Sequence, residues 1–163
     1  MREVTTKIYT FDELSEKAQE CAHESFWMRT EYPWTKEVED VLRELSDLFS
    51  FSVYSWEYDS IMAHHKESYS ERHYMTSGDD ARQWFKKHDA VINNHNCPLT
   101  GYYLDECALD PIRQFLEQPD RTDSVSDVLT ECVGNVFQAV VSDVDYYYSF
   151  ESFAESCDAN QYE

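Results

Sequence analysis

Residues 123–145 read DSVSDVLTECVGNVFQAVVSDVD and form the clearest helical pattern in the chain. Their apolar side chains recur at positions i, i+3, i+4 and i+7, which places them on one face of an α-helix. Valine is a modest helix former because its branched side chain loses rotamer freedom in a helix. We therefore expect this helix to depend on burial and to be the central element of the core. Its apolar seam comprises Val125, Val128, Leu129, Cys132, Val133, Val136, Phe137, Val140, Val141 and Val144.

Weaker patterns on both sides of this segment predict the rest of the fold. A helix is expected to follow Ser15 and to end before Pro33, because a residue that precedes proline disfavours the helical conformation. Further helices are predicted for residues 35–49, for a stretch that begins near 77, and for 104–117 and 149–160. Stretches rich in β-branched and aromatic residues predict strands at 4–10, 51–58 and 68–75. The expected fold class is α+β, with about five helices around the long valine-rich helix and a small antiparallel sheet.

Length and composition indicate one folded domain. The chain has 163 residues, of which 42% are hydrophobic and 15% aromatic, so it carries too much apolar material for a disordered tail. With 3 glycines and 4 prolines, most residues should lie in regular elements. We expect residues 1–163 to form a single acidic domain.

Charge is the property that most restricts function. Lys and Arg number 13 against 33 Asp and Glu, which gives a formal net charge of −20. Such a charge repels nucleic acids and anionic membranes, and it attracts basic proteins. The acids gather towards the two ends: net charge is −8 in residues 1–60, 0 in 61–100 and −12 in 101–163. A basic macromolecule is therefore the expected partner.

The cysteines and the amino-terminal sequence favour a reducing compartment. The 5 cysteines show no paired spacing, and residues 1–10 lack the apolar stretch of a signal peptide. No apolar run is long enough to span a bilayer. We expect a cytoplasmic protein with free thiols.

Two rows of carboxylates are the candidate partner-binding residues. Within the predicted helix 35–49, acids recur at intervals of 3, 4 and 3 residues, or roughly 4.5–6 Å of axial rise. A similar row opens the long helix. Because phosphates follow one DNA strand at about 3.4 Å intervals, two such rows can imitate a duplex in front of a basic groove. An ordinary solvated helix face is the alternative. The candidates are Glu37, Asp40, Glu44 and Asp47 in one row, and Asp123, Asp127 and Glu131 in the other.

The sequence offers little for catalysis or metal binding. His64, His65 and His73 form one possible ligand group, and His88, His95, Cys97 and Cys107 form another. A structural zinc site usually has two close ligand pairs, whereas His95 and Cys97 form one close pair without a matching second pair. Three glycines cannot build a nucleophile elbow or a phosphate loop. Cys21 and Cys132 fall on apolar helix stripes, where a buried hydrophobe is the usual explanation. We expect no enzyme, no cofactor and no metal.

Aromatic side chains supply a second kind of candidate surface. Tyr146, Tyr147 and Tyr148 are consecutive. Trp56 and Tyr58 lie in the predicted strand 51–58, and Trp84 lies in the helix predicted to begin near residue 77. Base stacking would lack the phosphate attraction that normally supplies affinity for nucleic acids. Core packing or a protein interface is therefore the expected role.

Both ends of the chain resemble a family of small proteins from phages and prophages. Residues 8–20 read IYTFDELSEKAQE, and that family opens with Y-x-F-D-E-L-S-x-x-A-x-x-x-A. Residues 148–163 read YSFESFAESCDANQYE and resemble its close, a short helix that leads to A-N-x-Y-x-F. The resemblance implies a phage-like origin and the bacterial host cytoplasm as the place of action, and it implies no catalytic residue.

Three functions are compatible with these observations. The leading hypothesis is a phage- or prophage-encoded inhibitor that binds a nucleic-acid-handling defence protein of the host as an acidic DNA or RNA mimic, of the anti-restriction or anti-CRISPR type. The first alternative is an antitoxin-like regulator that binds a basic toxin or host enzyme through an aromatic interface containing Trp56, Tyr58 or Tyr147. The second is a metal-binding enzyme or sensor built on the histidine-containing middle segment.

Overall fold

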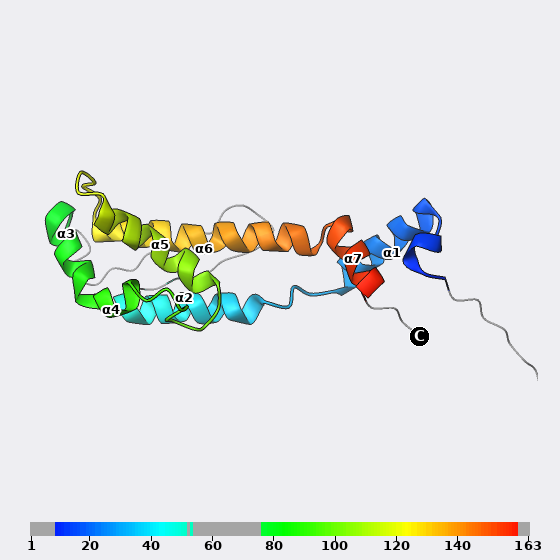
Figure 1. Cartoon of the computed structure of the whole chain (residues 1–163), viewed down its shortest axis with the longest axis horizontal. Coiled ribbons are helices and arrows are strands. Elements are labelled where there is room, and N and C mark those ends of the chain that lie inside the picture. The colour runs from blue at the N-terminus through cyan, green and yellow to red at the C-terminus, as the bar shows by residue number, and fades with distance from the viewer. Residues whose placement is uncertain (1–8, 52, 54–75, 160–163) are drawn as a thin grey trace, which may run out of the picture. The chain divides into compact units, whose positions relative to one another are not determined.

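The described part of the chain is helical. The computed structural model describes residues 9–51, 53 and 76–159. Its helices are α1 (Glu16–Arg29), α2 (Thr35–Phe49), α3 (Gly78–Phe85), α4 (Asp89–Ile92), α5 (Leu104–Glu117), α6 (Val125–Tyr147) and α7 (Phe150–Ala159), with the 3-10 turns η1 (Phe11–Glu13) and η3 (Lys86–His88) (Figure 1). The helices predicted at 35–49 and 104–117 are confirmed with the same bounds, and the long helix is confirmed as α6.

The predicted α+β class with an antiparallel sheet is wrong. Residues 9–51, 53 and 76–159 contain no strand, although an isolated antiparallel bridge joins Ser77 and Ser124. The predicted strands at 4–10, 51–58 and 68–75 lie largely outside the described residues. The described Phe51 instead completes the end of α2, where its N–H donates to the carbonyl of Ser46 over 3.1 Å and its side chain is buried. The preference of an aromatic residue for strands depends more on its packing partners than on its backbone. Phe51 can therefore pack at the end of a helix instead.

The contacts divide the chain into two compact units. The smaller unit contains Met1–Tyr32 and Ser142–Glu163, and the larger one contains Pro33–Val141. Helix α6 contributes residues to both. Two compact units can belong to one cooperative domain, so the prediction of a single domain over 1–163 stays a prediction.

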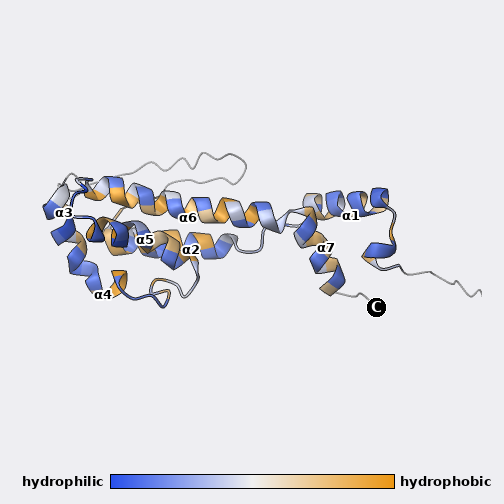
Figure 2. Cartoon of the chain, turned by 45° about the horizontal axis from the view of Figure 1, so that its top comes forward, coloured by the Kyte–Doolittle hydropathy of each residue, from blue (hydrophilic) through white to orange (hydrophobic). Residues whose placement is uncertain are grey.

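The core of the larger unit forms where α2, α5 and α6 present their apolar faces. Hydrophobic residues lie on the sides of these helices that face one another (Figure 2). Figures 1 and 2 both place α2 beside α6, with α5 against them. The predicted seam of α6 is buried through Val125, Val128, Leu129, Cys132, Val133, Val136 and Val140. Because branched side chains fill this interface, burial offsets their low helix propensity, as the pattern predicts.

Three buried charged side chains fasten the connections of the larger unit. Asp105 is fully buried and accepts hydrogen bonds from the N–H groups of Leu99, Thr100 and Gly101 over 2.8–3.1 Å, and from the Thr100 hydroxyl over 2.7 Å. Arg113 donates from Nε to the carbonyl of Ile92 over 2.6 Å. These bonds hold the connection that leads into α5.

Arg82 does the same for the connection between α5 and α6. Its Nη2 donates to the carbonyls of Gln118, Pro119 and Arg121 over 2.6–2.9 Å. The guanidinium carbon lies 4.8 Å from the ring centroid of Phe115. An arginine is suited to this place because its planar group carries several donors and stacks on an aromatic ring.

Aromatic contacts hold the smaller unit together. The ring centroid of Phe153 lies 5.4 Å from that of Phe11 and 5.1 Å from that of Phe26. His23 Nε2 lies 2.8 Å from the carbonyl oxygen of Tyr148. Neither α1 nor α7 buries any residue completely. The smaller unit therefore has an aromatic cluster in place of a closed aliphatic core.

Candidate partner-binding surface

The predicted carboxylate row of α2 is partly neutralised. Arg43 pairs with Asp40 over 2.8 Å and with Glu44 over 3.4 Å, and the hydrogen bond with Asp40 raises the pKa of Arg43. Glu37 is half-buried, and its buried Oε2 has no hydrogen-bond partner among the described residues. Asp47 is exposed. The row therefore presents fewer free charges than its spacing suggests.

The predicted row of α6 is engaged in local bonds. Arg121 donates to Asp123 from Nε and to Glu131 from Nη2, each over 2.8 Å, and the bond to Asp123 lowers the pKa of that carboxyl group. Asp127 accepts from the N–H of Ser124 over 3.0 Å and from its hydroxyl over 2.7 Å. These three carboxylates stabilise the start of α6, and a role for either row in binding stays a prediction.

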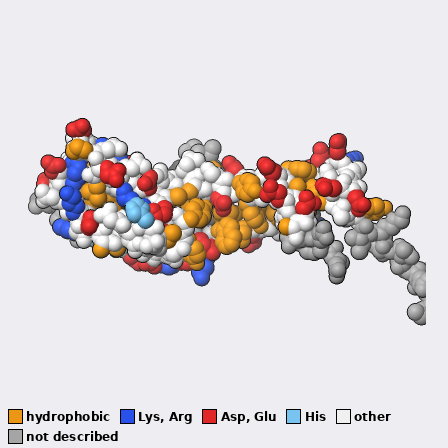
Figure 3. Space-filling model, in the orientation of Figure 1, with side chains coloured by type: hydrophobic (Ala, Val, Ile, Leu, Met, Phe, Trp, Pro, Cys, Tyr) orange, Lys and Arg blue, Asp and Glu red, His pale blue; other side chains and the backbone are white. Residues whose placement is uncertain are grey.

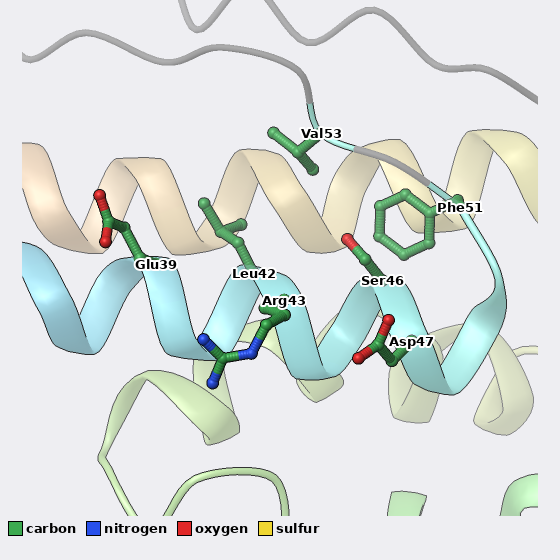
Figure 4. A pocket seen from close by; sticks show the side chains of 7 residues that line it. All are labelled: Glu39, Leu42, Arg43, Ser46, Asp47, Phe51 and Val53. Carbon is green, nitrogen blue, oxygen red and sulfur yellow. The ribbon is translucent and has the colours of Figure 1, made fainter.

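A groove of about 310 Å³ follows α2 (Figure 4). Arg43 lies between Glu39 and Asp47 along the helix, so opposite charges share one rim. The lining residues are Glu39, Leu42, Arg43, Ser46, Asp47, Phe51 and Val53. The described residues of this lining include neither histidine nor cysteine, and they supply no nucleophile with an adjacent base. We assign no reaction to the groove.

Unpaired carboxylates concentrate in the smaller unit instead. Its described residues, 9–32 and 142–159, contain 11 Asp and Glu against Lys17 and Arg29. Glu13, Asp143 and Glu155 accept hydrogen bonds from neighbours within the unit. Eight others are exposed and make no ion pair or hydrogen bond with the described residues: Asp12, Glu16, Glu20, Glu24, Glu31, Asp145, Glu151 and Asp158. Sequence spacing did not single out these carboxylates. They differ from the predicted rows in that no arginine pairs with them, and such pairs form only when the chain folds.

Helix α1 arranges three of these carboxylates along its outer side. Glu16, Glu20 and Glu24 recur every four residues, so successive members are about 6 Å apart along the axis and lie close to one face. On α7, Glu151, Glu155 and Asp158 follow the same kind of spacing. In Figure 3, acidic side chains are scattered over the visible face of this unit among hydrophobic and other residues, and few Lys or Arg side chains are seen there. Each helix therefore carries a short row of negative charges, and the described residues of the unit contain few basic side chains.

The tyrosine run is largely structural. Tyr147 packs with ring centroids 5.7 Å from those of Phe26 and Tyr32, and the Tyr32 hydroxyl donates to Asp143. Tyr146 is exposed. Trp56 and Tyr58, the other predicted interface residues, lie outside the described residues. Tyr147 therefore supports the fold of the smaller unit, and a role for Tyr147, Trp56 or Tyr58 in an interface stays a prediction.

Metal ligands are not assembled in the described residues. Within 9–51, 53 and 76–159 no three His, Cys, Asp or Glu side chains converge on a common point. His95 Nδ1 lies 3.4 Å from Glu106, and burial raises the pKa of the Cys97 and Cys107 thiols. The ring of His88 packs against those of Phe49 and Trp84, with centroids 5.1 and 5.5 Å apart. The other three candidates, His64, His65 and His73, lie outside the described residues. Among the described helices none is long and apolar enough to cross a membrane.

Thiol reactivity tests the placement of two cysteines. Cys132 is fully buried, and burial raises its pKa. Cys21 is exposed, so the prediction that it lies on a buried stripe is wrong: α1 turns that side towards solvent. We expect iodoacetamide to alkylate Cys21 in the native protein and Cys132 only after unfolding, as measured by peptide mass spectrometry. Equal native rates would contradict the burial of α6.

Comparison with known proteins adds no relative. No protein-family model, no curated protein and no solved structure matches this chain.

Proposed function

We propose that this chain is a phage-encoded inhibitor, not an enzyme, which acts in the host cytoplasm. It binds the basic nucleic-acid-binding surface of a host defence protein, and its carboxylates occupy positions that phosphates take in the natural complex. The observation that carries this proposal is the set of eight exposed carboxylates of the smaller unit that are unpaired within the described residues. The resemblance of both chain ends to phage proteins supports the origin.

The charge balance favours a basic partner over nucleic acid itself. A net charge of −20 repels phosphates at low salt, whereas a Lys- and Arg-lined groove gains from releasing its counter-ions. Successive carboxylates of α1 are about 6 Å apart along the axis, roughly twice the spacing of phosphates along one strand. Helix α7 adds a second short acidic row to the same unit.

Competition by DNA tests the mimicry. The chain is immobilised and exposed to bacterial lysate, and the bound proteins are eluted with a short DNA duplex or, separately, with neutral dextran. We expect duplex DNA to release a DNA- or RNA-binding protein, and dextran to release none. Capture should fall steeply between about 50 and 300 mM salt, since exposed charges are then screened. A bound protein that duplex DNA cannot displace, or whose capture is insensitive to salt, contradicts the proposal.

A matched pair of variants tests the surface. The triple variant E16Q/E20Q/E24Q removes three exposed charges from α1, and D80N/E117Q/D120N removes three exposed charges from the larger unit. Because exposed ion pairs contribute about 0.2–1 kcal/mol each, the α1 variant should weaken binding of the released protein about tenfold. The second variant should leave binding nearly unchanged. Equal losses would show that total charge, not the surface of α1, determines binding.

A further inference from the structure

Helix α1 ends in two large apolar side chains that none of the described elements covers. Trp27 is 60% exposed and Met28 is 75% exposed. In the same unit Tyr9, Tyr146 and Phe150 are exposed to a smaller extent, at 56%, 52% and 43%. Phe26, one residue before Trp27, packs against Phe153. Exposed apolar pairs next to charged residues are typical of protein-binding surfaces. Trp27 and Met28 are therefore candidates for an apolar contact with a partner, in addition to the contacts made by the carboxylates.

These residues share a face with the unpaired carboxylates. At 3.6 residues per turn, Glu16, Glu20, Glu24 and Trp27 fall within roughly 80° around the helix axis. Met28 lies beside them, four residues after Glu24. The outer face of α1 thus carries a row of negative charges that leads into an apolar end.

The chemistry of this face selects its occupant. A second copy of the chain would bring two strongly acidic units together, because the described residues of each unit contain 11 acidic and only 2 basic residues. Such units repel one another. A partner that complements the face needs positive charges over most of its length and an apolar site at one end. A basic helix with one apolar side meets both requirements, and helices of this kind read DNA grooves.

We propose that α1 docks a basic amphipathic helix of its partner. Trp27 and Met28 contact the apolar side of that helix, while Glu16, Glu20 and Glu24 face its Lys and Arg residues. Tryptophan is a frequent energetic anchor in interfaces, and the flexible methionine side chain adapts to varied partners. The inference rests on the proposed function, since it names the element of the basic partner that is recognised.

Two peptides of equal charge separate the apolar from the electrostatic contribution. One is an amphipathic helical peptide of leucine and lysine, and the other is an oligolysine. We expect the leucine–lysine peptide to bind the wild-type chain at least about tenfold more tightly than oligolysine, measured by isothermal titration calorimetry. The W27A/M28A variant should lose roughly 10- to 30-fold in affinity for the amphipathic peptide and little for oligolysine.

Control variants localise the effect. Trp34 lies in the larger unit and is 52% exposed, so W34A removes an exposed tryptophan outside the proposed face and should change neither affinity. The E16Q/E20Q/E24Q variant should weaken binding of both peptides. Cys21, which is exposed on α1, gives a local readout: the amphipathic peptide should protect it from alkylation, and oligolysine should protect it less. Circular dichroism checks that every variant keeps its helix content.

The outcomes distinguish this inference from the proposed function. If both peptides bind alike and W27A/M28A has no effect, the apolar contact is wrong while acidic recognition stands. If neither peptide binds the wild-type chain, both proposals fail. If the wild-type chain sediments as a dimer that W27A/M28A dissociates, a second copy covers this face and the inference is wrong.

Discussion

Replacement of Asp105 by alanine is expected to destabilise the protein by about 3–5 kcal/mol, because it leaves several buried donors without an acceptor. The carboxylate is fully buried and accepts from three consecutive N–H groups and one hydroxyl. It also lies in the first turn of α5, where the helix dipole favours a negative charge. Urea unfolding followed by circular dichroism measures the loss.

An asparagine at the same place is the informative control. The three N–H groups bond to Oδ2, and the amide oxygen of D105N can take that position. The Thr100 hydroxyl can then accept from the amide nitrogen, so we expect D105N to lose only about 1–2 kcal/mol, the difference between a charged and a neutral acceptor. Exposed D120A should be neutral. A cost below about 1 kcal/mol for D105A would contradict the anchoring role.

Truncation of Phe115 to alanine should cost a similar amount, about 3–5 kcal/mol, because it leaves a cavity in the core of the larger unit. The ring is fully buried and its centroid lies 6.0 Å from that of Phe85. The guanidinium carbons of Arg82 and Arg121 lie 4.8 and 5.7 Å from the same centroid. F115A therefore also removes the surface on which two structural arginines rest.

Leucine at position 115 separates these contributions. F115L keeps most of the apolar volume and removes the aromatic face, so it should cost about 1–1.5 kcal/mol. Thermal and urea unfolding of F115A and F115L against wild type provide the measurement. Losses that are equal for the two variants would mean that the aromatic face, and not the filled volume, accounts for the stabilisation.

The two units differ in how completely their side chains are buried. The larger unit has a closed core of helices whose connections are fastened by Asp105, Arg82 and Arg113. The smaller unit has an aromatic cluster, exposed carboxylates and an exposed tryptophan and methionine. A surface built on the less buried unit can adjust to a partner at little cost, since local opening is easiest where few apolar contacts are buried.

Arginine pairing shows how far spacing alone can identify a binding surface. The intervals that predicted Glu37 to Asp47 and Asp123 to Glu131 do place those acids on helices. Arg43 sits within the first row itself, and Arg121 reaches Glu131 across ten residues. Helical periodicity carries no information about an arginine that distant in sequence. Spacing alone therefore cannot distinguish acids that pair with an arginine from acids that do not.

The sequence by itself determined the main helices of the larger unit. Helices α2 and α5 and the valine seam of α6 follow from apolar periodicity. A helix that buries one face needs an apolar residue at every third or fourth position, and this pattern is local in the sequence. What only the tertiary structure decided is the fate of individual residues. Phe51 caps a helix and does not enter a strand, Asp105 is buried among N–H groups, and Trp27 remains exposed. The environment of each of these residues depends on which other parts of the chain pack or hydrogen-bond with it. Such contacts produce no periodic pattern in the sequence.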